Sequence, residues 1–363
     1  MTYERPNIMR MDGYSWGEQP EQEDSIKLNT NENPYPPSPN LNATLSQITL
    51  NSLRRYPHPT ADPLRDEIAK LHSLQRENIL ITHGGDEALR LSFTTFLDPK
   101  HCFGMTDPSY SLYPVLSEIN DSPVIRIPLE PDWKIPEHFS QTLNDSDVKL
   151  ACIVNPHAPS GYLSSGNEIK RIAEQFRGLL LVDEAYVDFV DPELKHDLTY
   201  LVEELENILI LRTFSKGYSL AGLRLGYLIG NPKLIDPIIR KTRDSYNIGF
   251  LEQQLGLEAI KHRDYSSTTW GLVRESREKL KIELQKIGFK VYPSQTNFLL
   301  VEIDSSEMLP AKSICTFLKS RGIFIRYFDT ERLSNKLRIS IGTPEQNDKL
   351  VSELINLLSK NTK

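Results

Sequence analysis

Residues 208–217 read ILILRTFSKG: four apolar residues, a short polar segment and then Lys216. Residues 149–154 and 179–182 are further apolar runs, and each is followed directly by a polar residue. Continuous apolar runs of this length are typical of strands that helices cover on both faces. The chain is therefore predicted to be an α/β protein with a mostly parallel sheet flanked by helices.

The polar residues at these strand ends point to a chemistry. In parallel α/β sheets, ligands bind beyond the carboxyl ends of the strands, where this chain has Asn155, Asp183 and Lys216. If the strands are neighbours, an amide, a carboxylate and an amine meet at one edge. A Gly-Gly-Asp turn at residues 84–86 opens a helix whose N-terminus suits a phosphate. An aldehyde cofactor with a phosphate, a phenolate and a pyridine nitrogen would use each group.

Each of these signals has an ordinary explanation when it stands alone. A carboxylate after an apolar run can cap a strand or bind a metal, a lysine in a loop is usually solvated, and a Gly-Gly turn is more often only a turn. In this chain the Gly-Gly-Asp turn, Asn155, Asp183 and Lys216 all occur, each after an expected strand. Their combination favours a site for pyridoxal phosphate.

Composition and charge exclude several classes of protein. The 363 residues carry a formal net charge of −7, which argues against nucleic acid as a partner. No apolar stretch is long enough to cross a bilayer, and none resembles a signal peptide. The three cysteines lie far apart without metal-type spacing and are interpreted as reduced thiols. We expect a cytoplasmic protein that binds neither a membrane nor a metal ion.

The order of the expected elements predicts two domains and an arm. Residues 1–44 are expected to form an N-terminal arm that packs on the small domain; its segment 29–40 holds four prolines and is interpreted as an extended arm lying on the surface of a domain. Residues 45–265 alternate helices and apolar strands and form the predicted large cofactor-binding domain. Residues 266–363 form a predicted smaller α+β domain, which begins with a long charged helix over about 267–287.

Four elements are predicted at the start of the large domain. A strand is expected over 78–82, and a helix over 87–96. A second strand over 102–106 is followed by Asp-Pro, after which a helix is predicted to begin near Ser109.

The segment around Lys216 resembles the lysine motif of the fold-type-I aminotransferases. The resemblance covers residues 213–217 (TFSKG) and 221–227 (AGLRLGY). In that family the lysine carries pyridoxal phosphate, and a serine just before it and an arginine eight residues on hold the phosphate. The resemblance implies these phosphate-binding roles for Ser215 and Arg224, with Thr213 nearby.

Further motifs resemble the same family. Residues 183–186 (DEAY) are similar to the motif whose aspartate pairs with the pyridine nitrogen and whose tyrosine meets the phenolic oxygen. Residues 107–110 (DPSY) resemble the segment whose tyrosine stacks on the ring. Residues 55–57 (RYP) resemble the segment whose tyrosine reaches the phosphate of the neighbouring subunit, so a homodimer is implied. The implied cofactor-binding residues are Gly85, Asp86, Tyr110, Asn155, Asp183, Tyr186, Thr213, Ser215, Lys216, Arg224 and the partner subunit's Tyr56.

Within these enzymes, the similarity to the histidinol-phosphate aminotransferase family runs almost end to end. Residues 29–34 (NTNENP) are similar to its arm signature, and Tyr14 lies where that family has a tyrosine in contact with substrate. Residues 322–326 and 337–343 are similar to its paired-arginine ending.

The resemblance implies a reaction between small anionic amino and keto compounds. Histidinol phosphate and 2-oxoglutarate would become imidazole-acetol phosphate and glutamate, with Lys216 as the catalytic amine. Tyr14, Arg326 and Arg338 are the expected substrate-binding residues, because a guanidinium grips a phosphate or a carboxylate through two parallel hydrogen bonds.

One loop departs from the family pattern. Residues 155–161 read NPHAPSG where the family usually has NPNNPTG, so Ala158 replaces an asparagine that bonds the phenolic oxygen. Alanine cannot make that bond. Either Asn155 or His157 replaces it, or Tyr186 makes the contact alone.

Other functions remain open at this stage. An aromatic amino-acid aminotransferase or a threonine-phosphate decarboxylase has similar motifs and needs an anion-binding arginine as well. An aminotransferase-like ligand-sensing domain of a regulator is disfavoured, because no helix-turn-helix segment precedes the arm. A nicotinamide dehydrogenase is disfavoured because no strand is followed by GxGxxG.

Overall fold

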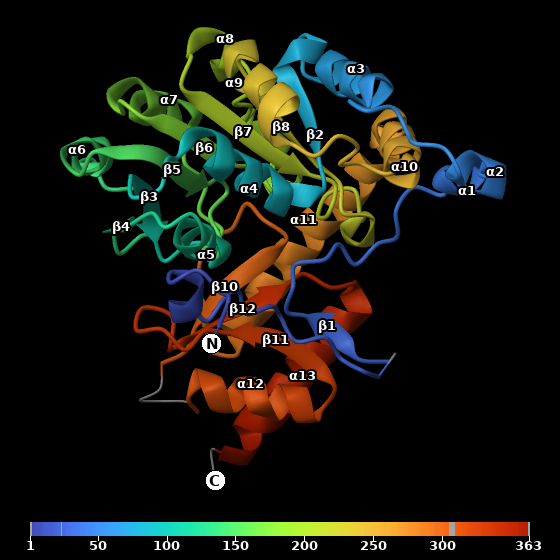
Figure 1. Cartoon of the computed structure of the whole chain (residues 1–363). Coiled ribbons are helices and arrows are strands. Elements are labelled where there is room, and N and C mark those ends of the chain that lie inside the picture. The colour runs from blue at the N-terminus through green and yellow to red at the C-terminus, as the bar shows by residue number, and fades with distance from the viewer. Residues whose placement is uncertain (1, 23, 305–308, 362–363) are drawn as a thin grey trace.

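The structure is a computed structural model and describes residues 2–22, 24–304 and 309–361. Its strands form two sheets, one of seven strands and one of five (Figure 1). Within the described residues, no helix is both long enough and apolar enough to cross a membrane.

The seven-stranded sheet has the order β2-β8-β7-β6-β5-β3-β4. Strands β7, β6, β5, β3 and β4 pair in parallel with one another along the sheet, whereas β8 runs antiparallel to both of its neighbours, β2 and β7. The prediction of a mostly parallel sheet is therefore confirmed. The strands are β2 (Ile79–Thr82), β3 (Cys102–Asp107), β4 (Val124–Pro128), β5 (Val148–Val154), β6 (Leu179–Asp183), β7 (Ile208–Thr213) and β8 (Gly226–Gly230).

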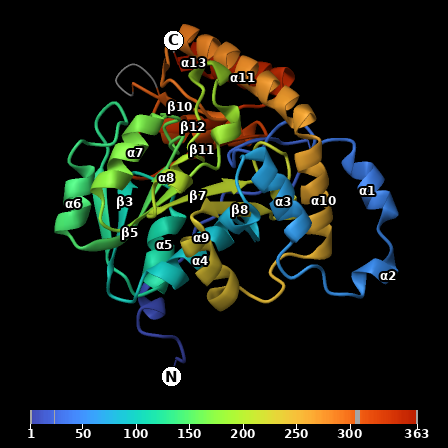
Figure 2. The ribbon, with the colours of Figure 1, turned by 90° about the horizontal axis from the view of Figure 1, so that it is seen from above.

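Helices pack around this sheet through apolar faces. In the helix over 166–175, for example, Ile169, Ile172 and Ala173 are buried, and the Ser165 side chain caps the first turn by accepting a hydrogen bond from the Glu168 amide. The helices of this layer are α3 (Asp62–Leu71), α4 (Gly84–Phe96), α5 (Leu112–Ile119), α6 (Phe139–Asp145), α7 (Gly166–Gln175), α8 (Leu201–Glu204), α9 (Pro232–Pro237) and α10 (Phe250–Lys261). Two short helices, α1 (Leu41–Gln47) and α2 (Leu50–Leu53), lie outside the layer at the edge of the molecule (Figure 2).

Short helical turns connect several of these elements. Five are 3-10 turns, η1 (Ile8–Arg10), η2 (Arg76–Asn78), η3 (Val187–Phe189), η4 (Pro192–Leu194) and η5 (Ala221–Leu223), and η6 (Ile238–Thr242) is a π-helical turn.

The helix that was expected to begin near Ser109 begins later. Residues 108–111 remain outside α5, and the Tyr110 ring packs edge-on against Tyr113 in the first turn of that helix. In this loop the Tyr110 ring has edge-on contacts with both Tyr113 and Tyr14.

The five-stranded sheet has the order β1-β11-β12-β10-β9 and combines the two ends of the chain. Its strands are β1 (Ile26–Leu28), β9 (Lys290–Val291), β10 (Phe298–Glu302), β11 (Ile323–Tyr327) and β12 (Lys336–Ser340), and its helices are α11 (Arg263–Lys286), α12 (Ala311–Ser320) and α13 (Pro344–Asn361). Strand β1, which belongs to the N-terminal arm, pairs in parallel with β11 at the sheet edge, and Asn29 and Asn31, which follow it, are buried.

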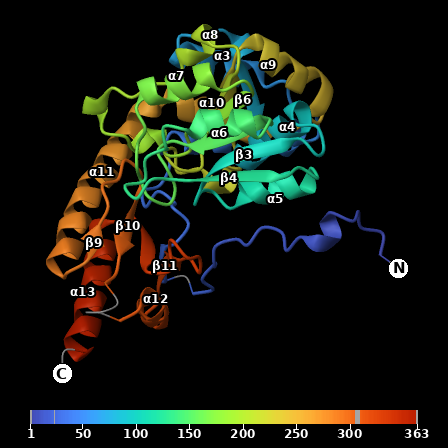
Figure 3. The ribbon, with the colours of Figure 1, turned by 90° about the vertical axis from the view of Figure 1, so that its left-hand side faces the viewer.

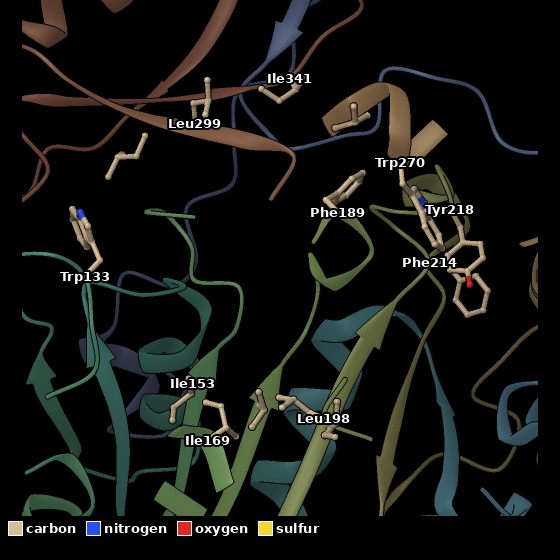
Figure 4. Packing of buried hydrophobic residues seen from close by; sticks show 14 of the residues in the cluster. Trp133, Ile153, Ile169, Phe189, Leu198, Phe214, Tyr218, Trp270, Leu299 and Ile341 are labelled. Atoms are coloured by element: carbon tan, nitrogen blue, oxygen red, sulfur yellow. The ribbon is translucent and has the colours of Figure 1, made fainter. Parts of the chain in front are cut away.

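The long helix α11 runs from the region of the seven-stranded sheet to the region of the five-stranded sheet (Figure 3). Its Trp270 packs edge-on against Tyr218, which in turn contacts Phe214, and Figure 4 shows these rings gathered near Phe189. The Trp270 indole also donates a 2.6 Å hydrogen bond to the Gly217 carbonyl. The helix thereby fixes the backbone residue that follows Lys216.

Candidate active site

Three neighbouring strands bring the predicted amide, carboxylate and amine to one sheet edge. Val154 pairs with Asp183, and Asp183 pairs with Leu211, so β5, β6 and β7 end side by side. The condition for their convergence, that these strands are neighbours, is met. Asn155 follows β5 directly, and Lys216 stands three residues after the end of β7.

Asp183 is a buried carboxylate with a donor on each oxygen. The Tyr113 hydroxyl donates to its Oδ2 at 2.8 Å, and the Ala185 amide donates to its Oδ1 at 3.0 Å. Burial raises the pKa of Asp183 from 3.8 to about 6, although both hydrogen bonds oppose this rise. A cationic N–H group placed beside Asp183 would compensate for the buried charge.

The Lys216 amine lies buried between the loop after β7 and the N-terminal arm. Its Nζ donates a 2.8 Å hydrogen bond to the Thr30 carbonyl. Burial, and next the positive charge of Arg338, lower the pKa of Lys216 to about 8. Roughly a tenth of the amine is then neutral at pH 7 and able to act as a nucleophile or a base.

A cradle for an anion lies at the N-terminus of α4. Gly84 has a φ of +72°, and a Cβ on it would lie 2.8 Å from Nη2 of Arg224. The Arg224 guanidinium is 3.1 Å from Oδ2 of Asp86 and 3.5 Å from Oγ of Ser215. The Thr213 hydroxyl donates to Oγ of Ser215 at 3.0 Å. A helix N-terminus combined with a guanidinium and hydroxyl groups suits a phosphate, and Gly85 lies in this first turn.

Aromatic hydroxyls line the space between this cradle and the arm. Tyr110 packs edge-on against Tyr14, with ring centroids 6.0 Å apart. The Tyr186 hydroxyl oxygen accepts a 3.0 Å hydrogen bond from Nδ2 of Asn31. Because an amide nitrogen only donates, the hydroxyl proton of Tyr186 remains available to another acceptor in the site.

The loop that departs from the family pattern is held by its own hydrogen bonds. Asn155 bonds both the amide and the carbonyl of Ser164. His157 bonds Oγ of Ser160 at 2.7 Å and the Pro108 carbonyl at 2.9 Å. In this arrangement the hydrogen bonds of the Asn155 and His157 side chains hold the loop itself, whereas the Tyr186 hydroxyl bonds Asn31.

Two arginines stand directly opposite each other on the small sheet. Arg326 of β11 pairs with Arg338 of β12 in the antiparallel register. The Arg338 guanidinium lies between the rings of Phe298 and Phe328, and its Nε is buried without a hydrogen-bond partner. Like charges at directly opposed positions destabilise a sheet, and a buried unpaired donor adds to that cost. An anion bound between the two guanidinium groups would relieve both.

Tyr56 lies apart from these residues. Its side chain is 80% exposed and stacks on Tyr246, with centroids 4.5 Å apart. It follows α2 at the periphery (Figure 2), so the chain's own site does not include it.

The sequence predictions missed three contributors to the site. Thr30 contributes a backbone carbonyl and Asn31 an amide, both from the arm signature. Tyr113 contributes a hydroxyl to Asp183, and no motif in the sequence indicated this role.

The donor set fits pyridoxal phosphate group by group. A buried amine of lowered pKa suits the aldehyde, a buried carboxylate suits the pyridine nitrogen, and the cradle at α4 suits the phosphate. Fold and site together define a pyridoxal-phosphate-dependent aminotransferase of fold type I.

Comparison with known proteins identifies the family. Residues 23–354 match the model of aminotransferase class I and II, and the chain belongs to this family. A histidinol-phosphate aminotransferase of Oceanobacillus iheyensis is 40% identical, over 96% of each chain, and one of Trichormus variabilis is 37% identical, over 98% of this chain and 99% of that one. The chain thus groups with the histidinol-phosphate aminotransferases. A structure of that enzyme from Sinorhizobium meliloti, in complex with pyridoxal-5'-phosphate, has a TM-score of 0.90 and 22% identity, covering 99% of this chain and 98% of that one, and so supports the fold.

Proposed function

We propose that this enzyme transfers the amino group of histidinol phosphate to 2-oxoglutarate, giving imidazole-acetol phosphate and glutamate in histidine biosynthesis. The observation that carries the proposal is the opposed pair Arg326 and Arg338, with the buried unpaired Nε of Arg338. Both substrates carry an anionic end that such a pair can bind. The names of the relatives that cover nearly the whole chain support histidinol phosphate as a substrate.

The chain's own residues divide the work of the reaction. When bound, pyridoxal phosphate supplies an aldehyde carbon for amino groups and a ring that withdraws electrons. Lys216, with a pKa near 8, takes the proton from the substrate carbon that bears the amino group. Asp183 keeps a proton on the pyridine nitrogen, since its buried charge is best compensated by a cation.

The remaining residues bind and orient. The α4 N-terminus, with Gly85 and Asp86, and the side chains of Thr213, Ser215 and Arg224 are assigned to the phosphate of the cofactor. The Tyr186 hydroxyl would donate to the phenolic oxygen of the cofactor, and Tyr110 would cover its ring. Tyr14 and the arginine pair position the substrate so that its proton faces Lys216.

The proposal includes a homodimer in the cytoplasm. Leu50 and Tyr56, on and just after the peripheral helix α2, are 87% and 80% exposed. Large apolar side chains grouped at a protruding segment are typical of a subunit interface. In a twofold dimer, such a segment can reach the site of the other protomer, which is the role assigned to Tyr56.

A substrate screen tests the proposal. Purified enzyme with pyridoxal phosphate and 2-oxoglutarate is supplied separately with histidinol phosphate, phenylalanine, tyrosine and threonine phosphate, and glutamate and the product from each amino compound are quantified. The expected result is glutamate and imidazole-acetol phosphate in equal amounts, with histidinol phosphate as the best donor. Efficient use of phenylalanine with no reaction of histidinol phosphate would assign an aromatic aminotransferase. Loss of carbon dioxide from threonine phosphate would assign a decarboxylase.

A further inference from the structure

Tyr113 contacts both the Asp183 carboxylate and Tyr110, the residue that is expected to cover the cofactor ring. Tyr113, in the first turn of α5, is completely buried, and its hydroxyl donates to Oδ2 of Asp183 at 2.8 Å. Its ring packs edge-on against Tyr110 at a centroid distance of 5.5 Å and against Phe103 at 6.3 Å. The ring contacts fix the direction of the hydroxyl, because a buried aromatic side chain in such packing has few alternative rotamers.

The surroundings of Asp183 otherwise oppose its ionisation. Burial is the largest factor that disfavours the charge, and the charges of Asp86 and Glu184 add to it. The titratable groups that face Asp183 come from every adjoining element: Asp86 from α4, Cys152 from β5, Tyr113 from α5, and Glu184 and Tyr186 from its own strand end. The hydrogen bonds from Tyr113 and from the Ala185 amide favour the ionised form.

We propose that Tyr113 is a positioning residue of the amino-transfer site, which holds the Asp183 carboxylate ionised and fixed at the end of β6. The inference rests on the proposed role of Asp183 toward the pyridine nitrogen. An ionised carboxylate offers about four acceptor directions. The two donors on Asp183 therefore orient it while directions remain for a third donor. Tyr113 also packs against Tyr110, so one side chain positions both the carboxylate and the aromatic ring expected to cover the cofactor.

The first test measures Asp183 in the protein without cofactor. Aspartate labelled with ¹³C at Cγ reports the carboxyl titration by NMR, and the Asp183 signal is assigned by its absence in Asp183→Asn. Tyr113→Phe removes one oxygen and keeps the ring. A hydrogen bond to a charged acceptor that is lost in this way should raise the pKa of Asp183 by about one pH unit. An unchanged Asp183 titration in Tyr113→Phe would overturn the proposal.

Tyr227→Phe is the matched control. Tyr227 is buried on β8, and its hydroxyl lies 3.2 Å from Nε2 of His72. This variant also removes one buried tyrosine hydroxyl, yet it should leave the Asp183 titration where it is in the unmodified protein. An equal shift in both variants would show a general loss of packing and would contradict a specific role of Tyr113.

A second measurement does not depend on a folded variant. In the unmodified protein, the ¹³Cζ signal of Tyr113 should shift with the same midpoint as the Asp183 carboxyl. The reason is that the Tyr113 hydroxyl donates its hydrogen bond to this carboxyl and responds to the change in its charge. Independent midpoints would overturn the coupling.

The holoenzyme separates a failure of this inference from a failure of the proposed function. In Tyr113→Phe, kcat should fall by about tenfold with a smaller change in KM, and the acid limb of the pH profile should move to higher pH. Full turnover in Asp183→Asn would overturn the proposed function of Asp183 and with it the role of Tyr113. Normal kcat and an unmoved pH profile in Tyr113→Phe would overturn the role of Tyr113 alone.

Discussion

Replacing Asp183 by asparagine should stabilise the cofactor-free protein at neutral and higher pH while it disables the enzyme. Burial raises the pKa of this carboxyl from 3.8 to about 6. That difference corresponds to about 3 kcal/mol of unfolding free energy that the ionised group costs in the folded protein. Removing the charge should recover this amount, because a functional carboxylate kept in a buried site is a source of instability.

The sign of the pH dependence follows from the direction of the pKa change. A folded-state pKa above the unfolded value means that the folded protein binds more protons between pH 3.8 and about 6. The loss of unfolding free energy caused by the ionised Asp183 is therefore absent at low pH, grows as the pH rises through this window, and is constant above it. The advantage of Asp183→Asn should be about 3 kcal/mol near pH 8 and about half of that near pH 5.

The amide fits the existing hydrogen bonds. Its oxygen can accept from the Ala185 amide, and its NH₂ group can donate to the Tyr113 hydroxyl oxygen, which both donates and accepts. The assay is urea unfolding of both cofactor-free proteins across this pH range, at one protein concentration, since subunit association also contributes to stability. A stability difference that is constant with pH, or that favours the unmodified protein as pH rises, would refute this explanation of Asp183.

Four further predictions concern the reaction. Lys216→Ala should abolish turnover, as measured by glutamate formation, and leave the circular dichroism spectrum unchanged; turnover above the uncatalysed rate would contradict the role of Lys216 as the catalytic amine. Arg338→Lys should slow the half-reactions with glutamate and with histidinol phosphate by about a hundredfold in single-turnover absorbance, because lysine lacks the two aligned donors; wild-type rates in both would exclude it as the anion anchor. Asn31→Ala should reduce kcat about tenfold through Tyr186, and Ala158→Asn should restore part of that loss; no change in the first variant would remove Asn31 from the site. Mixing refolded Tyr56→Ala and Lys216→Ala chains should give about a quarter of wild-type activity through mixed dimers with one intact site; a mixture as inactive as its parents would place Tyr56 outside the partner's site.

The central strands could be predicted because burial on both faces leaves an unambiguous apolar run. Residues 179–182 and 208–211 are such runs, and their pairing as neighbours brings Asp183 and Lys216 to one carboxyl edge. Strand β4 has Arg126 and ends in Pro128 at the sheet edge, so its pattern is weaker. Strand β8 was missed because it is a run of only three apolar residues between two glycines.

The parts of the site that sequence could not predict depend on backbone atoms and on long-range pairing. The acceptor for the Lys216 amine is the carbonyl of Thr30, a group that every residue carries. Segment 29–40 could be predicted to be extended, because prolines exclude it from helices and central strands, but the burial of Asn31 could not be predicted. Its burial results from β1 pairing with β11, about 300 residues away in the chain.

The most direct test of the central claim is the position at which the cofactor attaches. The protein is incubated with pyridoxal phosphate, reduced with borohydride, digested and mapped by mass spectrometry. The geometry predicts one pyridoxyl phosphate group, on the peptide that contains Lys216, because this amine is buried at the strand edge with a pKa lowered to about 8. An adduct on another lysine, with Lys216 unmodified, would contradict the site and the reaction assigned to it.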